Sequence, residues 1–330
     1  MIETIAEVTP DRVGEQAAVV SPTRVMVALI RREFWEHRAL WFVPLVVGAL
    51  LICLASVAKF GGAGYDRMQH APFSSSSDGS VVDAHAAGVA LSSIQQALLV
   101  VPFFMSTAVI LWFYLLSSLY DERKDRSILF WKSLPVSDSA TVLSKLLVAA
   151  VVVPLGVYLV WILTHLLCVA VLRARLALGL ATAPFTWDTI AWLKVNALML
   201  TTVVMSSLWY APIAAYLLLV SAWARRNPFL WAVLPPLMLW IVERVAFQTN
   251  YLGHLFGYRL ALWKSLGPDD GTFNGAILQT PFGKLPSLPA AFDLLDYRHL
   301  LANFDLWAGV AVGAVLVYVA IRLRRYRDDT

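Results

Sequence analysis

The chain has 330 residues, of which 59% are hydrophobic and 15% are charged, and its mean hydropathy is +0.68. Soluble domains average roughly 45–50% apolar and about 25% charged residues, so this composition argues against a soluble fold and for a membrane protein. The net charge of +4 resides at the ends of apolar segments rather than in a separate basic patch, which argues against a nucleic-acid partner.

The N-terminal region divides into a tail and a helix. Residues 1–21 are polar and lack an early apolar core, which predicts a tail without a cleavable signal. Residues 22–38 predict a helix that begins at Pro22, with Met26, Ile30 and Phe34 at four-residue spacing. Its polar side is expected to carry Arg31, Arg32, Glu33 and Arg38. This pattern is typical of an amphipathic helix in the membrane interface, and the alternative is a cytoplasmic extension of the first span.

Six apolar segments are long enough to cross the hydrocarbon core, which takes about 20 residues. They lie near Leu40–Ala58, Gln95–Leu119, Val142–Leu172, Val195–Val220, Phe229–Phe247 and Leu306–Ile321. We therefore expect an all-α integral membrane protein with six transmembrane helices in one domain, residues 39–322. Lys145, near the start of the third span, is expected to extend toward the inner surface.

The distribution of Lys and Arg predicts the orientation. With both termini cytoplasmic, the inner segments carry most of these residues, ending in the basic tail at 323–330 that follows the last span. This bias agrees with the positive-inside rule. We expect a multi-pass protein of the inner, cytoplasmic membrane of a bacterium.

Two outer regions differ in character. Residues 59–93 include the serine-rich run Ser74–Ser80 and predict a solvated spacer. Residues 248–305 mix apolar stretches too short to span, Tyr251–Leu266 and Pro286–Leu295, with several Gly and Pro breakers. Two short re-entrant helices and an ordinary surface loop both fit this pattern.

The polar segment between the second and third spans, YDERKDRSILFWKSLPVSD at 120–138, is the main functional candidate. Charged residues come first, an apolar cluster follows, and Pro135 ends the predicted helix. Such a helix could dock in a groove of another protein, and burial among lipid headgroups or a plain basic loop are the alternatives. The docking candidates are Glu122, Arg123, Arg126, Ser127, Ile128, Leu129, Phe130, Trp131 and Leu134.

This segment resembles the cytoplasmic loop of ABC-2 type transporter permeases. The residues that carry the resemblance are Glu122, Arg123, Ser127, Pro135, Val136 and Ser137. In that family the equivalent short helix is a coupling helix that sits in a cleft of an ATP-binding subunit. The chain departs from many relatives at Arg126 and at the apolar run Leu129–Trp131.

The resemblance implies a division of labour between subunits. Two permease subunits, identical or different, would form the pathway, and separate ATP-binding cassette subunits would bind ATP and Mg. The cargo would be exported, and the scarcity of charge deep in most spans favours an amphipathic or hydrophobic one. An ion-coupled carrier and a non-transporting membrane anchor or assembly factor are the alternatives.

No catalytic motif is present in the sequence. It contains no G-x-x-x-x-G-K-[ST], H-E-x-x-H, C-x-x-C or G-x-S-x-G pattern, so we expect no enzyme activity and no cofactor or metal site in this chain. Cys53 and Cys168 fall within predicted spans and are interpreted as small apolar residues.

Four polar residues within or near the spans are candidates for a transport pathway or an outer gate. Glu243 and Arg244 lie near the outer end of the fifth span, where they could line a pathway mouth, hold the re-entrant region or extend to the interface. His165 and Asn196 are single polar groups in the third and fourth spans, where an interhelical hydrogen bond is the alternative to a pathway role.

Overall fold

The computed structural model describes residues 21–57, 84–125, 136–180, 187–260 and 301–326. This part of the chain is 89% helical and contains no strand. The helices are α1 (Pro22–Glu36), α2 (Ala39–Val57), α4 (Ala84–Ser117), α5 (Tyr120–Lys124), α7 (Asp138–Leu147), the π-helix η1 (Val148–Val152), α8 (Val153–Ala177), α9 (Thr189–Trp209), α10 (Ala211–Trp223), α11 (Pro228–Val242), the π-helix η2 (Glu243–Phe247), α12 (Tyr251–Leu260) and α16 (Phe304–Tyr326).

The prediction of an all-α multi-pass membrane protein is confirmed. Among the described residues, six helices are long and apolar enough to span a bilayer. They cover Ala39–Val57, Leu99–Lys124, Asp138–Ala177, Thr189–Trp209, Pro228–Phe247 and Phe304–Tyr326. Most of their surface is apolar and exposed, because in a bilayer the lipid tails cover side chains that water would otherwise meet.

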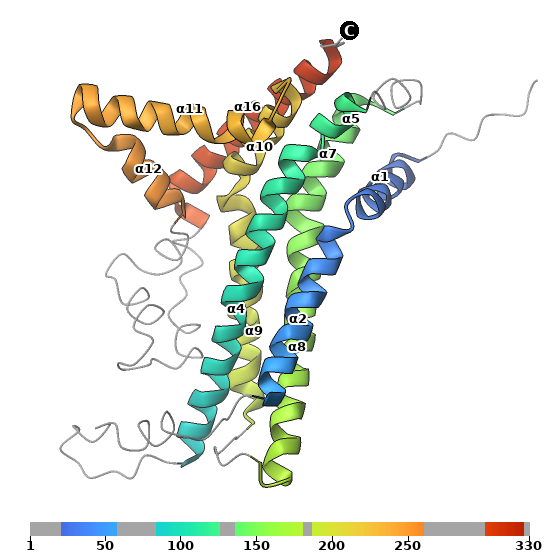
Figure 1. Cartoon of the computed structure of the whole chain (residues 1–330), viewed down its shortest axis with the longest axis vertical. Coiled ribbons are helices and arrows are strands. Elements are labelled where there is room, and N and C mark those ends of the chain that lie inside the picture. Colours follow the sequence, from blue (N-terminus) through green and yellow to red (C-terminus); the bar gives the residue numbers. More distant parts are fainter. Residues whose placement is uncertain (1–20, 58–83, 126–135, 181–186, 261–300, 327–330) are drawn as a thin grey trace, which may run out of the picture.

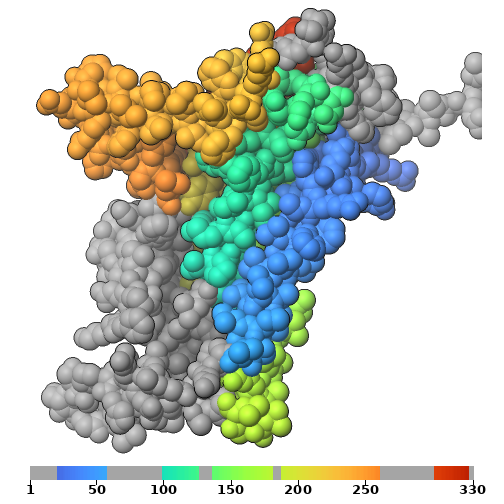
Figure 2. Space-filling model, in the orientation of Figure 1, coloured from blue at the N-terminus to red at the C-terminus, as the bar shows by residue number. Residues whose placement is uncertain are grey.

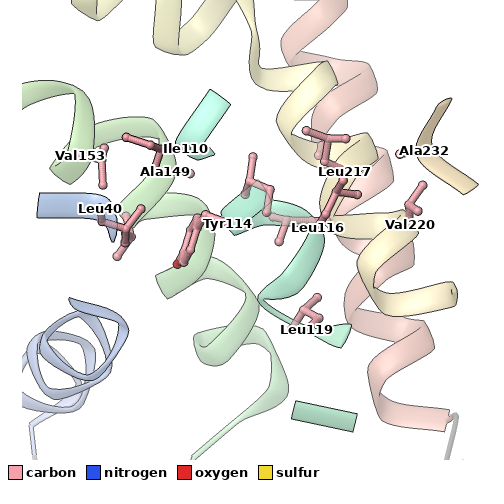
Figure 3. Close-up of a cluster of buried hydrophobic side chains, with 14 of the residues drawn as sticks. Leu40, Ile110, Tyr114, Leu116, Leu119, Ala149, Val153, Leu217, Val220 and Ala232 are labelled. Carbon is pink, nitrogen blue, oxygen red and sulfur yellow. The ribbon is translucent and has the colours of Figure 1, made fainter. Parts of the chain in front are cut away.

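Long helices form the centre of the molecule. α4, α8 and α9 run beside one another along its longest dimension, α2 packs against α8, and α10 packs against α16 (Figure 1). The buried apolar cluster lies where these helices meet, with Tyr114 and Leu116 of α4 facing Ala149 of η1 and Leu217 of α10 (Figure 3). This packing places the ends of helices far apart in sequence next to each other.

The helix termini show how local sequence sets the elements. Pro22 begins α1, as predicted, because proline is tolerated on the first turn. Ser137 caps α7 by accepting a hydrogen bond from the backbone N–H of Ala140 at 3.2 Å, which confirms it as an N-cap. α4 begins at Ala84, earlier than the predicted span, because a helix can continue past the hydrocarbon through small helix-forming residues.

The fourth span differs from its prediction. A single helix was expected over Val195–Val220, but α9 ends at Trp209 and α10 begins at Ala211. Pro212 lies on the first turn of α10 and has no N–H to continue the hydrogen-bond ladder of α9. The chain therefore changes helix inside an uninterrupted apolar segment.

α11 has a different direction from the central helices. It extends to one side of the bundle at the end where α5 lies, and α12 returns from it toward the start of α16 (Figure 1). The turn into α11 uses Asn227 with a positive φ of 46°. In the space-filling view, α11 and α12 project to the left of α4, on the side away from α2 (Figure 2). α12 confirms a short helix beginning at Tyr251, and residues 261–300 of the predicted outer region lie outside the described residues.

Candidate functional site

A buried ionic cluster joins α1, α5, α7 and α16 at one end of the bundle. These elements gather at the same end in Figure 1. Its four innermost members are two carboxylates and two cations that are at most 6% exposed: Glu33, Glu122, Lys145 and Arg324. Arg32, Glu36, Asp138 and Tyr114 surround them.

Glu122, on the short helix α5, is the centre of the ionic cluster. Its Oε1 accepts from Arg32 of α1 at 2.9 Å and lies 3.1 Å from Nζ of Lys145 on α7. Its Oε2 accepts from Arg324 of α16 at 2.5 Å. One carboxylate therefore ties the segment between the second and third spans to three other helices.

Glu33 of α1 is the second buried anion. Its Oε1 accepts from Lys145 Nζ at 2.7 Å, and its Oε2 accepts from the Tyr114 hydroxyl at 2.9 Å. The ring of His37 packs edge-on against Tyr114, with its Nε2 3.8 Å from Glu33. Burial lowers the pKa of His37, which lies outside the spans.

Two expectations from the sequence are corrected by these contacts. Lys145 was expected to extend to the inner surface, but it is fully buried because Glu33 and Glu122 both meet its ammonium inside the fold. Glu33 was expected on the polar side of an interfacial helix, but it is 1% exposed. Glu33 follows the buried Leu29 by four residues, so both lie on the same face of α1. This four-residue spacing is the feature of the sequence that could have indicated the burial of Glu33.

Arg324 completes the ionic cluster from the C-terminal helix. It donates to Glu122, and its Nε donates to Asp138 at the start of α7 at 3.1 Å. The sequence identifies Arg324 only as one of several basic residues after the last span, and only the packing of α16 against α7 distinguishes it.

The ionic cluster is electrically balanced at its centre, where two carboxylates meet two cations. Buried charges are tolerated when each is paired and hydrogen-bonded, and loss of one partner leaves an uncompensated charge at a cost of about 3–5 kcal/mol. We infer that the relative positions of α1, α5, α7 and α16 are strongly coupled. A displacement of α5 must either carry these helices with it or break several charged contacts.

Arg123 makes a second connection from α5. Its guanidinium donates to the carbonyl oxygens of Ser221 and Ala224 at 2.6 and 2.9 Å, at the C-terminal end of α10. The hydroxyl oxygen of Ser221 in turn accepts from the backbone N–H groups of Leu119 and Tyr120, each at 3.0 Å. A cation and a hydroxyl thus satisfy backbone groups at two helix ends that have no partner within their own helices.

Of the predicted docking residues, Glu122 and Arg123 therefore face helices of this same chain. The remaining predicted docking residues, Arg126, Ser127, Ile128, Leu129, Phe130, Trp131 and Leu134, lie outside the described residues. The described part shows what anchors the beginning of this segment, and the docking role stays a prediction.

Three side chains at the edge of the ionic cluster could hold a metal ion on geometry alone. One ligand atom from each of Glu33, Glu36 and His37 lies within 4.8 Å of the others. The carboxylate of Glu33 is met by Lys145 and Tyr114, and that of Glu36 by Arg32 at 2.6 and 3.1 Å. This geometry favours ion pairing over metal coordination.

The predicted outer-gate residues are separated into two groups. Glu243 accepts from Thr249 at 3.0 Å and from the backbone N–H groups of Tyr251 and Leu252, so it caps the first turn of α12. Arg244 is exposed beside it. Among the described residues, no hydrogen bond or ion pair joins Glu243 to His165 or Asn196. Glu243 thus holds the start of the predicted outer region, which is one of the roles that the sequence predicts for it.

His165 and Asn196 lie at the interface of α8 and α9. Trp192 on α9 donates to Nδ1 of His165 at 3.4 Å, which confirms an interhelical hydrogen bond for His165. The amide nitrogen of Asn196 instead donates within its own helix, to the carbonyl of Trp192 at 2.7 Å. Trp192 therefore connects the two predicted residues.

No protein-family model matches the chain, and no curated protein or solved structure matches it either.

Proposed function

We propose that this chain is the membrane-spanning permease subunit of an ABC-2 type transporter, powered by a separate ATP-binding subunit that docks on the segment near 122–135. The proposal rests on the sequence resemblance and on one structural observation. Glu122, at the root of that segment, contacts α1, α7 and α16 through Arg32, Lys145 and Arg324.

These contacts suit the transmission of a mechanical signal. A partner that moves residues 126–135 pulls on α5 over a short length of chain, and the ionic cluster passes the displacement to three helices. Because buried ion pairs tolerate little separation, the helices follow α5 rather than release it. Arg123 extends the same connection to the end of α10.

In this proposal the end of the bundle that holds the ionic cluster faces the cytoplasm, and a second permease subunit, identical or different, completes the pathway. The cargo is exported and amphipathic or hydrophobic. The proposal assigns ATP and Mg to the partner subunit, in keeping with the lack of a phosphate-binding loop motif in this sequence.

The test is purification of the tagged full-length chain from native membranes in mild detergent, followed by identification of bound chains and an ATPase assay. We expect a stoichiometric ATP-binding subunit. The double variant Phe130→Asp with Trp131→Asp should lose the partner and its coupled ATP hydrolysis. A matched control is Trp35→Asp with Tyr326→Asp, two exposed aromatics that lie outside this segment and outside the apolar parts of the spans.

The outcome separates the proposal from its alternatives. Unchanged co-purification and ATP turnover in the Phe130 and Trp131 variant would contradict docking at this segment. A partner that binds without cargo-stimulated ATP hydrolysis would indicate an anchor or assembly factor. Two buried carboxylates, Glu33 and Glu122, are the observation that favours an ion-coupled carrier. Both already meet cations of this chain, which argues against a proton- or ion-binding role.

A further inference from the structure

The interface between α8 and α9 contains a second set of buried polar side chains, separate from the ionic cluster. Tyr158, Trp161 and His165 lie on one face of α8, with neighbouring ring centroids 5.9 and 6.3 Å apart. Trp187 stacks next on His165 at 6.5 Å, and Trp192 of α9 lies 5.7 Å beyond it. The result is a column of aromatic rings inside the apolar bundle.

Three polar atoms at this interface lack a protein partner in the described part of the chain. They are Trp161 Nε1, His165 Nε2 and Asn196 Oδ1. Trp161, His165 and Asn196 are only 3%, 1% and 7% exposed, respectively. A buried polar group without a hydrogen bond costs about 1–3 kcal/mol, and the alternative partners available in hydrocarbon are few.

The hydrogen-bonding capacity of these atoms is complementary. Trp192 donates to Nδ1 of His165, so in the neutral imidazole the ring proton lies on Nε2. Trp161 Nε1 is also a donor, whereas Asn196 Oδ1 is an acceptor. The interface therefore offers two N–H donors and one carbonyl acceptor. An oxygen that accepts from N–H groups and donates one O–H matches this set.

The three side chains come from the same stretch of the interface between α8 and α9. Trp161 and His165 are one turn apart with stacked rings, and the Asn196 amide is bonded to the residue whose indole contacts His165. The Tyr158 hydroxyl donates to the backbone carbonyl of Asn196 at 3.1 Å, which places Asn196 against the same stretch of α8.

We propose that this interface binds a hydroxyl-type oxygen, either water or the hydroxyl of an amphiphile, between Trp161, His165 and Asn196. The site does not depend on an ATP-binding partner and goes beyond the proposed function. Water and an amphiphile share this chemistry, and the experiment distinguishes them.

The first measurement is a double-mutant cycle on the full chain in detergent, using Trp161→Phe, Asn196→Leu and the combination. Each single variant is expected to lower the thermal midpoint by about 2–4 °C, and the double variant by less than the sum of the two singles, since both lose the same bridging oxygen. Trp41→Phe, at an exposed indole of α2, is the matched control and should leave the midpoint unchanged. Strictly additive effects would overturn the proposal.

The second measurement uses the unaltered protein and identifies the source of the oxygen. Radiolytic hydroxyl labelling in ¹⁸O-water should modify Trp161 and His165 despite their burial if the oxygen is water. An amphiphile would instead protect both residues and appear by mass spectrometry as a co-purifying hydroxyl compound that the Asn196→Leu variant loses. Neither labelling nor a co-purifying compound would overturn the proposal, whatever the stability data show.

Discussion

At the residue scale, the pairing of buried charges decides the chemistry of the molecule. Lys145 lies 2.7 Å from Glu33 and 3.1 Å from Glu122, so one ammonium neutralises parts of two carboxylates. An ammonium with two anionic neighbours can be fully buried, whereas an isolated one would require the surface. The same argument applies to Arg324, which meets Glu122 and Asp138.

Replacement of Lys145 by Met is expected to destabilise the fold by about 3–5 kcal/mol, because Glu33 and Glu122 then face each other without their shared cation. Lys124→Met is the matched control, because Lys124 is an exposed lysine of α5, the helix that also carries Glu122. Its effect on the free energy of unfolding should stay within about 0.5 kcal/mol. Equilibrium unfolding in mixed detergent micelles measures both. Equal stability of the two variants would show that the ionic cluster contributes no net stability.

His37 predicts a pH dependence with a definite sign. Burial lowers its pKa in the folded state below the ordinary value of 6.5, so the unfolded chain takes up the proton first as the pH falls. This contribution to stability is complete above pH 6.5 and is progressively lost as the pH falls below that value.

The His37→Gln variant lacks this titration. We expect its thermal midpoint to fall less than that of the unmodified protein between pH 7.5 and 5.5, because only His37 differs between the two curves. His254→Gln, at an exposed position of α12, is the control and should follow the unmodified protein. Identical pH profiles for all three proteins would contradict the burial argument.

At the element scale, the close packing of α10 against α16 is the main contact of the last span. Gly313 of α16 faces the start of α10, where an added Cβ would lie 3.3 Å from the backbone of Ala211. Small residues at such a point let two helix backbones approach closely. Near the start of α16, Arg259 of α12 covers Gly309 and stacks on Trp209 with its guanidinium carbon 4.7 Å from the ring.

Replacement of Gly313 by Leu should separate α10 from α16 and cost about 1–3 kcal/mol through overpacking. Gly156→Leu provides the control, because an added Cβ at Gly156 of α8 meets no atom within 4 Å. Thermal unfolding of the two variants side by side measures the difference. A Gly313 variant as stable as the Gly156 variant would show that the two helices are less closely packed than the structure indicates.

At the scale of the whole molecule, the ionic cluster defines one end of the bundle and the turn after α8 lies at the other. α1, α5, the start of α7 and the end of α16 all meet at the cluster end (Figure 1). Positive charge along the sequence concentrates in the same segments, and the positive-inside rule therefore predicts that this end faces the cytoplasm.

This orientation predicts the accessibility of two exposed positions. With the native cysteines replaced by Ala, Leu180→Cys at the turn after α8 should react with an impermeant maleimide on intact cells. Lys124→Cys at the cluster end should react only after the membrane is permeabilised. The reverse labelling pattern would invert the topology and exclude a cytoplasmic partner at residues 122–135.

The sequence by itself determined the class of the molecule, because length and hydropathy are enough to identify a membrane-spanning helix. It also predicted the local features that depend on neighbouring residues, such as Pro22 at the start of α1 and the Ser137 cap of α7. The position of Lys145 shows the limit. In sequence it resembles any basic residue near a span end, since its burial depends on Glu33, which lies 112 residues away.

Only the tertiary structure decided which charges pair. Directly paired members of the ionic cluster lie up to 202 residues apart in the sequence, and the residues next to each of them give no sign of its partner. The approach of Trp161 and His165 to Asn196 likewise depends on how α8 and α9 pack. Local sequence patterns predict whether a segment prefers to be helical and to lie in a bilayer. They do not predict which distant charges pair, because that depends on how the folded helices bring those residues into contact.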